Sequence, residues 1–242
     1  MYMRPAPHRG CHLRPLSKLL TAIFLLGMVT DLISCMKERA EESEGIVQAV
    51  RQTSATRQKA GKTGAKAAIR VYVASPLGFA CSTRPFMERD LIPAIEDAGV
   101  EAVNPWDLPP DPLVEMLQKE VDSAQDLPRR KKAWDKLVVA IGARNAEHIA
   151  SADGVVAVLD GVDVDSGTAA EIGYAAALGK WMIGYRGDFR RTGEDPAATV
   201  NLQVEYFIRK NGGTIVRNLA DLKTQLKQMA VAHARRLTGT QK

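Results

Sequence analysis

Short apolar runs alternate with longer amphipathic segments from residue 69 to the end of the chain. The short runs are rich in β-branched residues and are bounded by glycine, proline or polar residues, which predicts buried strands. These runs are 69–75, 100–104, 154–159, 181–185 and 214–216. In the longer segments apolar residues recur at helical spacing, which predicts helices. These segments are 85–98, 112–124, 129–151, 168–178, 200–210 and 219–235.

This alternation of strands and helices predicts an α/β fold. Because the strands are apolar along their length, both faces of the sheet must be covered, which is typical of a parallel sheet. Five strands suit a Rossmann-like, flavodoxin-like doubly wound sheet with helices on both faces. Ligands bind such sheets at the carboxyl ends of the strands. The loops after Ser75, Leu159 and Tyr185 are therefore the first candidates for a site.

The first 68 residues follow a different pattern. Residues 1–18 are basic, and residues 19–30 form an apolar run that is short for a membrane span. The segment that ends at Cys35 resembles a lipoprotein signal, although Asp31 interrupts its apolar part. Alternatively, translation begins further along, for example at Met36. We therefore expect a signal-like extension over 1–35, a polar and poorly packed linker over 36–68, and one catalytic domain over 69–242.

Net charge gives no support for nucleic-acid binding by the main domain. The chain carries 33 Lys and Arg against 28 Asp and Glu. Residues 1–68 account for the whole excess, with 11 basic against 5 acidic residues, so the remainder is close to neutral. A phosphate-binding surface usually shows a local basic excess. The three cysteines have neither a disulfide framework nor zinc-ligand spacing.

The loop after Leu159 holds the strongest candidate chemistry. Asp160, Asp163 and Asp165 lie between a predicted buried strand and a helix that is predicted to start at Thr168. Glu171 then falls in the first turn of this helix, where the helix dipole would favour its ionised form. An ionised carboxylate suits an anionic nucleophile.

Two simpler interpretations of this loop remain open at this point. Thr168 and Glu171 have the spacing of a capping box, in which the glutamate only accepts a backbone N–H. The three aspartates could form a polar turn or a site for Mg²⁺ or Ca²⁺, although EF-hand spacing is absent. A Ser–His–Asp triad has little support, because His148 is the only histidine of the main domain before its last helix.

Several motifs occur in series and are together more specific than any one of them. They are YVASPLGF from Tyr72, NPW from Asn104, IGxxN from Ile141 to Asn145, DSGTAAEIGYA from Asp165, GYRGDFR from Gly184, NLQVE from Asn201 and the pair Gly212-Gly213. Over about residues 69–226 the chain is similar to the nucleoside 2-deoxyribosyltransferase family.

The resemblance implies a role for individual residues. Glu171 would be the nucleophile, Asp165 would contact the base and move its proton, and Tyr72 would orient the nucleophile. Asn145 stands where some members have an aspartate, and it would bind substrate without transferring a proton. The other residues implied in substrate binding are Gly78 and Phe79, which line the base pocket, Asp160, Ser166, Gln203, and Asn201, which reaches the 5' end of the sugar across a subunit interface.

The resemblance also implies a reaction. Glu171 would displace the base of a 2'-deoxynucleoside, and a second base would attack the resulting ester with net retention. This reaction needs neither metal nor cofactor. The resemblance further implies a role in nucleotide salvage, small-molecule deoxynucleosides and free nucleobases as substrates, a homo-oligomer with shared active sites, and a cytoplasmic location. The lipoprotein signal at Cys35 is the alternative for the location.

Two rival functions remain open. An N-glycosidase of deoxynucleoside 5'-monophosphates would need a phosphate cradle, for which Ser75, Ser82, Thr83 and Arg84 are the candidates. A non-catalytic nucleotide-binding module would not need Glu171 together with its two proposed partners.

Other polar and aromatic residues have less specific patterns. Arg186, Asp188 and Arg190 follow a predicted strand, and they either line the mouth of the site or form a salt bridge within their loop. Trp106 and Trp134 are expected in the core. Cys81 has no neighbouring base in sequence that would activate it.

Overall fold

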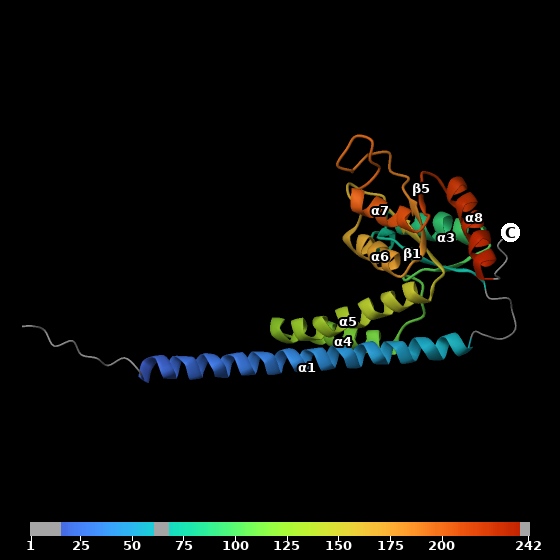
Figure 1. The fold of residues 1–242 in the computed structure, drawn as a ribbon. Coiled ribbons are helices and arrows are strands. Elements are labelled where there is room, and N and C mark those ends of the chain that lie inside the picture. Colours follow the sequence, from blue (N-terminus) through green and yellow to red (C-terminus); the bar gives the residue numbers. More distant parts are fainter. Residues whose placement is uncertain (1–15, 61–67, 238–242) are drawn as a thin grey trace, which may run out of the picture. The chain divides into compact units, whose positions relative to one another are not determined.

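The structure is a computed structural model that describes residues 16–60 and 68–237, and the side chains of 28–52 and 68–237. Contacts divide the chain into two compact units, with the boundary between Ile46 and Val47. The second unit contains a parallel sheet of five strands (Figure 1). The strands are β1 (Arg70–Ala74), β2 (Glu101–Val103), β3 (Gly154–Val158), β4 (Trp181–Tyr185) and β5 (Thr214–Val216).

The strand order is β2-β1-β3-β4-β5, with every neighbouring pair parallel. This is the doubly wound, flavodoxin-like order. The predicted fold class is therefore confirmed, and each strand lies within one residue of its predicted ends. The chain leaves β1 toward one edge of the sheet and later returns to pair β3 with β1 on its other side. The carboxyl ends of β1 and β3 thus form the switch point where ligands bind in such sheets.

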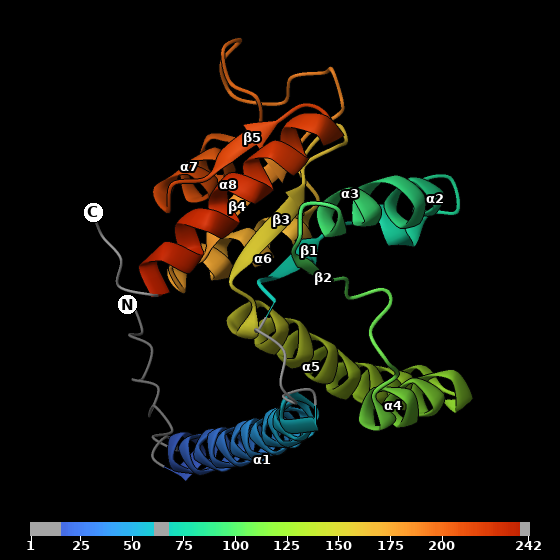
Figure 2. The ribbon, with the colours of Figure 1, turned by 90° about the vertical axis from the view of Figure 1, so that its right-hand side faces the viewer.

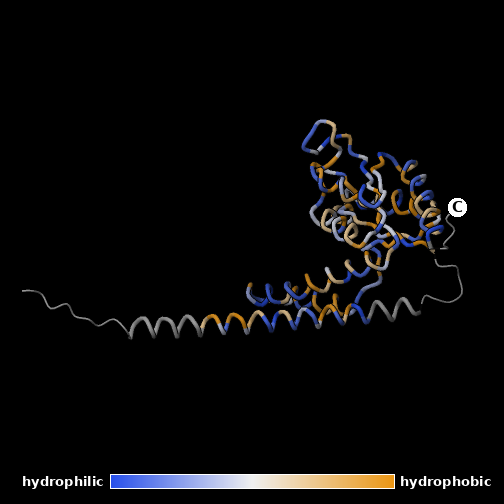
Figure 3. The backbone as a smooth tube through the Cα atoms, viewed as in Figure 1, coloured by the Kyte–Doolittle hydropathy of each residue, from blue (hydrophilic) through white to orange (hydrophobic). Residues whose placement is uncertain are grey.

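Helices cover both faces of the sheet. The helices that follow β1 along the chain are α2 (Arg84–Phe86), a π-helical turn (Met87–Leu91), α3 (Ile92–Glu96), α4 (Pro112–Ser123), α5 (Leu127–Ser151), α6 (Ser166–Ala177), α7 (Leu202–Lys210) and α8 (Leu219–Leu237). Of these, α4 and α5 pack mainly against each other rather than on the sheet. Figure 1 shows α3 and α8 on one side of the strands and α6 and α7 on the other, and Figure 2 shows α4 beside α5. Figure 3 shows polar and apolar residues alternating along these helices, as expected for elements with one buried side.

Successive strand residues point into two separate cores. Val71 and Val73 join the core beneath α3 and α8. Tyr72 and Ala74 join the core beneath α6 and α7. Because alternation is strict, the side chain of Tyr72 must enter the same layer as α6. This placement later brings its hydroxyl to the candidate site.

Side chains at the helix starts explain several boundaries. Asp111, Asp126 and Asn201 are N-cap residues whose side chains accept backbone N–H groups of α4, α5 and α7. Thr83 is the N-cap residue of α2, but its side chain makes no capping hydrogen bond to that helix. The Thr83 hydroxyl instead donates to the carbonyl of Leu77 at 2.7 Å.

One predicted core residue is also corrected. Trp134 is 52% exposed, because α5 buries Leu137 and Ala140 on another side of the helix. Trp106 packs against the core beneath α3, as predicted, while remaining partly exposed.

The N-terminal part of the chain forms one long helix, α1 (Leu16–Ala60). It includes residues 36–60 of the predicted linker. Residues 1–15 of the predicted signal-like extension and residues 61–67 of the linker lie outside the described residues. In the part of the chain that the structure describes, no helix is long and apolar enough to cross a membrane.

Candidate active site

Glu171 lies in the second turn of α6, not in the first turn as predicted. The helix begins at Ser166, and its N-cap is Asp165. The Asp165 carboxylate accepts the backbone N–H of Thr168 at 2.9 Å, so Thr168 is a residue of the first turn rather than a cap. The capping-box interpretation of Glu171 is therefore wrong, and the dipole argument for its ionisation does not apply.

The carboxylate of Glu171 instead accepts side-chain hydrogen bonds from two other elements. The hydroxyl of Tyr72 in β1 donates to Glu171 Oε1 at 2.6 Å. The amide Nδ2 of Asn145 in α5 makes a longer contact of 3.4 Å with the same oxygen. Both donors therefore act on one oxygen and leave Oε2 outside these contacts. This arrangement orients a carboxylate while keeping one oxygen available.

Burial and a neighbouring charge both act on the ionisation of Glu171. Loss of hydration raises the pKa of this carboxyl above its usual value of 4.5. The hydrogen bond from Tyr72 opposes this change by lowering the pKa, and the negative charge of Asp165 raises it further. Burial and the adjacent carboxylate raise the pKa of Tyr72 far above its usual value, so Tyr72 stays a neutral donor.

Asp165 combines a structural contact with a position close to Glu171. Its Oδ2 atom accepts both the backbone N–H and the hydroxyl of Thr168, the latter at 3.2 Å. A Cβ atom on Gly167 would lie 3.1 Å from the same Oδ2. The glycine of this motif therefore leaves room for the carboxylate, and Oδ1 lies outside the two capping contacts.

The three aspartates after β3 do not converge on one point. Asp160 Oδ1 accepts the backbone N–H of Asp188 at 2.8 Å, and Asp163 Oδ1 accepts that of Val164. Asp165 points to the start of α6. Among the described residues, no group of three or more His, Cys, Asp or Glu side chains could hold a metal ion.

An aromatic wall stands after β1, built from Gly78, Phe79 and Trp106. Phe79 is 77% exposed and meets the Trp106 ring edge-on, with ring centroids 4.5 Å apart. The indole N–H of Trp106 donates to the carbonyl of Ser75 at 3.2 Å, which fixes the ring beside the end of β1. Of the two predicted base-pocket residues, Phe79 lies on this exposed, anchored surface and Gly78 is buried against the Trp106 ring.

Gly78→Ala is expected to displace this wall. The new Cβ would lie 2.2 Å from the Trp106 ring, and overpacking of this kind typically costs about 1–3 kcal/mol. Thermal melting and tryptophan fluorescence should both change. Gly142→Ala in α5 is the control, because a Cβ there meets nothing within 4 Å. Alanine also favours a helix more than glycine does, so this variant should not lose stability. Equal melting temperatures for the two variants would contradict the prediction.

The candidate phosphate cradle is occupied by contacts within the chain. Ser75 Oγ accepts the backbone N–H of Leu77, and the Thr83 hydroxyl donates to carbonyl oxygens. The Arg84 guanidinium pairs with Glu88 at 2.6 Å. These partners would have to be exchanged before the residues could bind a phosphate.

The structure does not bring the remaining predicted substrate residues to Glu171 through hydrogen bonds between described residues. Asn201 caps α7 and also donates to Glu194, and Gln203 is an exposed residue of the same helix. Ser166 is an exposed residue at the start of α6.

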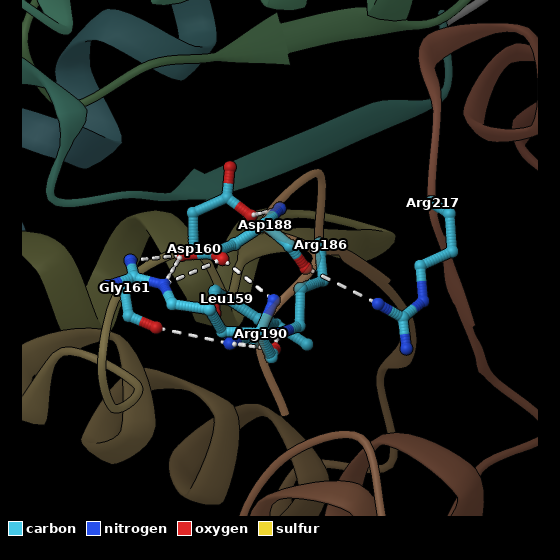
Figure 4. A network of polar contacts seen from close by, with 7 residues as sticks. All are labelled: Leu159, Asp160, Gly161, Arg186, Asp188, Arg190 and Arg217. Atoms are coloured by element: carbon cyan, nitrogen blue, oxygen red, sulfur yellow. Dashed lines mark hydrogen bonds and ion pairs between the residues drawn. The ribbon is translucent and has the colours of Figure 1, made fainter. Parts of the chain in front are cut away.

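Arg186 was not singled out by the sequence as a buried residue, yet its side chain is fully buried. The salt bridge within the loop forms between Asp188 and Arg190, as one of the two sequence interpretations predicted. The Arg190 guanidinium holds the pKa of Asp188 well below its usual range. Figure 4 shows that Arg186 instead faces backbone carbonyls of the loop after β3. A charged residue directly after an apolar strand was the available signal.

A family model described as nucleoside 2-deoxyribosyltransferase matches residues 71–207, more than half of the chain. A conserved protein from Enterococcus faecalis V583 is 23% identical, covering 67% of this chain and 99% of that one, with a TM-score of 0.47. The 2-deoxyribosyltransferase of Bacillus psychrosaccharolyticus is 20% identical, covering 65% of this chain and 95% of that one, with a TM-score of 0.38. A CMP N-glycosidase of Clostridium botulinum is 19% identical, covering 66% of this chain and 98% of that one, with a TM-score of 0.36. No curated protein matches the chain.

Proposed function

Because the chain belongs to the nucleoside 2-deoxyribosyltransferase family, we propose that it exchanges the base of 2'-deoxynucleosides through an ester between deoxyribose and Glu171. The observation that supports this proposal best is the contact between Tyr72 and Glu171 at 2.6 Å, together with Asn145 on the same oxygen. A carboxylate held in this way at the switch point of the sheet suits a nucleophile better than a structural residue.

The first step displaces the base. Glu171 Oε2 attacks C1' of the sugar, and the new C–O bond forms as the C1'–N bond breaks. The bonding electrons leave with the base, which takes up a proton. In the second step an incoming base attacks C1' from the side that the first base left, and the carboxylate is released. Two displacements at the same carbon retain its configuration, and the steps require no metal or cofactor.

The other polar residues divide the remaining tasks. Asp165 in its protonated form donates its proton to the departing base and then takes a proton back from the incoming base. Asn145 binds the substrate in addition to contacting Glu171. Gly78 and Phe79 form the side of the pocket against which the base packs, supported by the anchored Trp106. Asp160 contacts the substrate from the loop between β3 and α6, and Ser166 contacts it from the first turn of α6.

Asn201 and Gln203 are proposed to serve the active site of a second copy in a homo-oligomer. Within their own chain Asn201 caps α7. The same helix exposes Leu202 and Tyr206, with exposed fractions of 59% and 54%, and such apolar residues are typical of a surface that packs against another subunit.

The direct test is a base-exchange assay on the full-length protein. 2'-Deoxyinosine is incubated with free adenine or with cytosine, and the products are separated by chromatography. A new deoxynucleoside supports the transferase. Release of free base and deoxyribose without exchange indicates a hydrolase, in which case 2'-deoxynucleoside 5'-monophosphates are the substrates to compare. If neither reaction occurs with any of these substrates, the proposed function is wrong and a non-catalytic binding module is favoured.

Tyr72→Phe is expected to shift the pH profile of the reaction. The wild-type hydroxyl lowers the pKa of Glu171, so its removal raises that pKa further. Attack needs the ionised carboxylate, and the acid limb of kcat/KM therefore moves to higher pH. The loss of activity is larger at pH 6 than at pH 8.

Tyr174→Phe is the matched control, because Tyr174 is 42% exposed and takes part in none of the contacts described at Glu171. Its pH profile is expected to coincide with that of the wild type. An acid limb that stays in place in Tyr72→Phe would show that the hydroxyl does not control the ionisation of the nucleophile.

A further inference from the structure

We propose that Arg186 is a positioning residue that fixes the loop between β3 and α6, and through it Asp165, in the geometry that proton transfer requires. This inference rests on the proposed function for the role of Asp165. The role of Arg186 in ordering the loop is independent of the proposed function. The contacts concerned join residues 159–161 to residues 186–190 and are called the loop network below.

Arg186 is the largest fully buried side chain of the described residues, with no exposed surface. Its Nη1 donates to the carbonyl of Leu159, and its Nη2 donates to that of Gly161 at 3.1 Å. Nε and Nη2 also donate to the carbonyl of Arg190, at 3.2 and 2.8 Å. One guanidinium therefore links the last residues of the β3 strand region to the loop that follows β4 (Figure 4).

The link is reciprocal. The backbone N–H of Asp188 donates to Asp160 Oδ1 at 2.8 Å, and the backbone N–H of Gly161 donates to the Asp188 carboxylate. Gly161 has φ of +123°, a conformation that residues with a Cβ rarely adopt. The backbone N–H of Arg186 itself donates to Val216 in β5. The loop after β3 is thus attached to a residue whose own backbone is part of the sheet.

Three residues separate Gly161 from Asp165. Within this interval Val164 is buried in the core beneath α6, and Asp165 caps that helix. The interval is therefore fixed at both ends, by the loop network and by the helix start. Displacing Gly161 would change the direction from which Asp165 approaches the site, because so short a segment has little freedom to absorb the change.

The contacts also explain why the residue is an arginine. Carbonyls lying in different directions are reached by a planar group with five N–H donors, whereas the ammonium of lysine is a compact point with three. A buried cation needs such saturation, since its loss of hydration is otherwise uncompensated. Lysine would retain the charge and lose the simultaneous contacts.

The experiment compares wild type with Arg186→Lys in the base-exchange assay. It uses a temperature at which circular dichroism shows both proteins to be folded. We expect kcat to fall by about tenfold or more while KM stays within about threefold, since misplacement of a group that acts in the transition state lowers kcat. Hydrogen exchange followed by mass spectrometry is expected to show faster uptake in residues 159–168, with β3 unchanged.

Arg217→Lys is the matched control, because Arg217 is exposed and its contact with the carbonyl of Asp188 is long, at 3.3 Å. It is expected to match the wild type in kcat and in hydrogen exchange. If Arg186→Lys does not fold, Asp188→Ala removes the acceptor of the Gly161 N–H instead. It should give the same pattern with a smaller loss of kcat.

Separate outcomes distinguish the two proposals. Unchanged kcat in a folded Arg186→Lys protein would overturn the positioning role, even if its melting temperature fell. Wild type without exchange or hydrolysis would overturn the proposed function. Hydrogen exchange then decides the role of Arg186 by itself, because unchanged uptake in residues 159–168 would overturn it and faster uptake would support it.

Discussion

Glu171→Gln is expected to lower kcat for base exchange by about 10⁴–10⁶-fold, the range found when a nucleophile is removed from an enzyme. The amide keeps nearly the shape of the carboxylate and can still accept the hydroxyl of Tyr72. It cannot form the ester with C1'. Chromatography of the exchange products measures the loss, and mass spectrometry of the wild type after brief incubation with 2'-deoxyinosine tests for the covalent ester.

The same substitution is expected to stabilise the fold. A carboxyl whose pKa is raised by burial is destabilising once it ionises, so its cost is absent below the unfolded-state pKa and fully present above the folded-state pKa. The melting temperature of Glu171→Gln should therefore exceed that of wild type at pH 7, and the difference should shrink as the pH falls toward 4.5. Each kcal/mol recovered corresponds to about 2–4 °C for a domain of this size.

Glu205→Gln is the control for both measurements. Glu205 lies on α7, pairs with Arg209 and belongs to no part of the proposed chemistry. It should keep wild-type kcat and should not become more stable. Retained exchange activity in Glu171→Gln would mean that the role assigned to Glu171 is wrong. The stability prediction would be wrong if Glu171→Gln gained no melting temperature over wild type at pH 7, or gained less at pH 7 than at pH 4.5.

Asp165→Asn is expected to lower kcat by about 10²–10⁴-fold, the usual contribution of a group that transfers a proton in the transition state. Asparagine is as good an N-cap as aspartate, so α6 should still form and the melting temperature should change little. Asp165→Ala should lose the cap as well, at a cost of about 1 kcal/mol. The comparison of kcat and melting temperature separates the two functions of one carboxylate.

A substrate with a different leaving group sharpens this test. The base of 7-methyl-2'-deoxyguanosine already carries a positive charge and leaves as a neutral molecule without taking up a proton. Asp165→Asn should therefore be impaired much less with this nucleoside than with 2'-deoxyinosine. Asp163→Asn is the control in the same loop, because Asp163 is exposed and contacts only its neighbour's backbone N–H among the hydrogen bonds described above. Equal losses of kcat in Asp165→Asn and Asp163→Asn with 2'-deoxyinosine would contradict the assignment of proton transfer to Asp165.

The strands and their order were predictable because the signals are local and strong. Apolar runs such as 154–158 and 181–185 are short, fully buried and bounded by turn residues. The start of α6 was predicted two residues too late, since Ser166 and Gly167 are weak helix formers. Their place in the helix depends on the Asp165 side chain, and a cap of this kind is visible only once the backbone is positioned.

The sequence indicated several residues of the candidate site but not the contacts between them. The motifs indicated Tyr72, Asn145 and Glu171, and the structure joins all three. That both donors act on the same oxygen follows from the crossing of β1, α5 and α6, which no spacing reports. The partners of Arg186 were equally hidden, because they are backbone carbonyls and those carry no residue-type signal.

The loop network has a consequence for attempts to alter substrate choice by exchanging loops with other members of the family. The segments 159–165 and 186–190 share hydrogen bonds in both directions, so neither is an independent module. A chimera that receives only one of them places a foreign backbone opposite Arg186 and leaves a buried cation without its carbonyls. The two loops should therefore be transplanted together. A library that varies only one of them is expected to yield mainly variants in which these loops are misfolded.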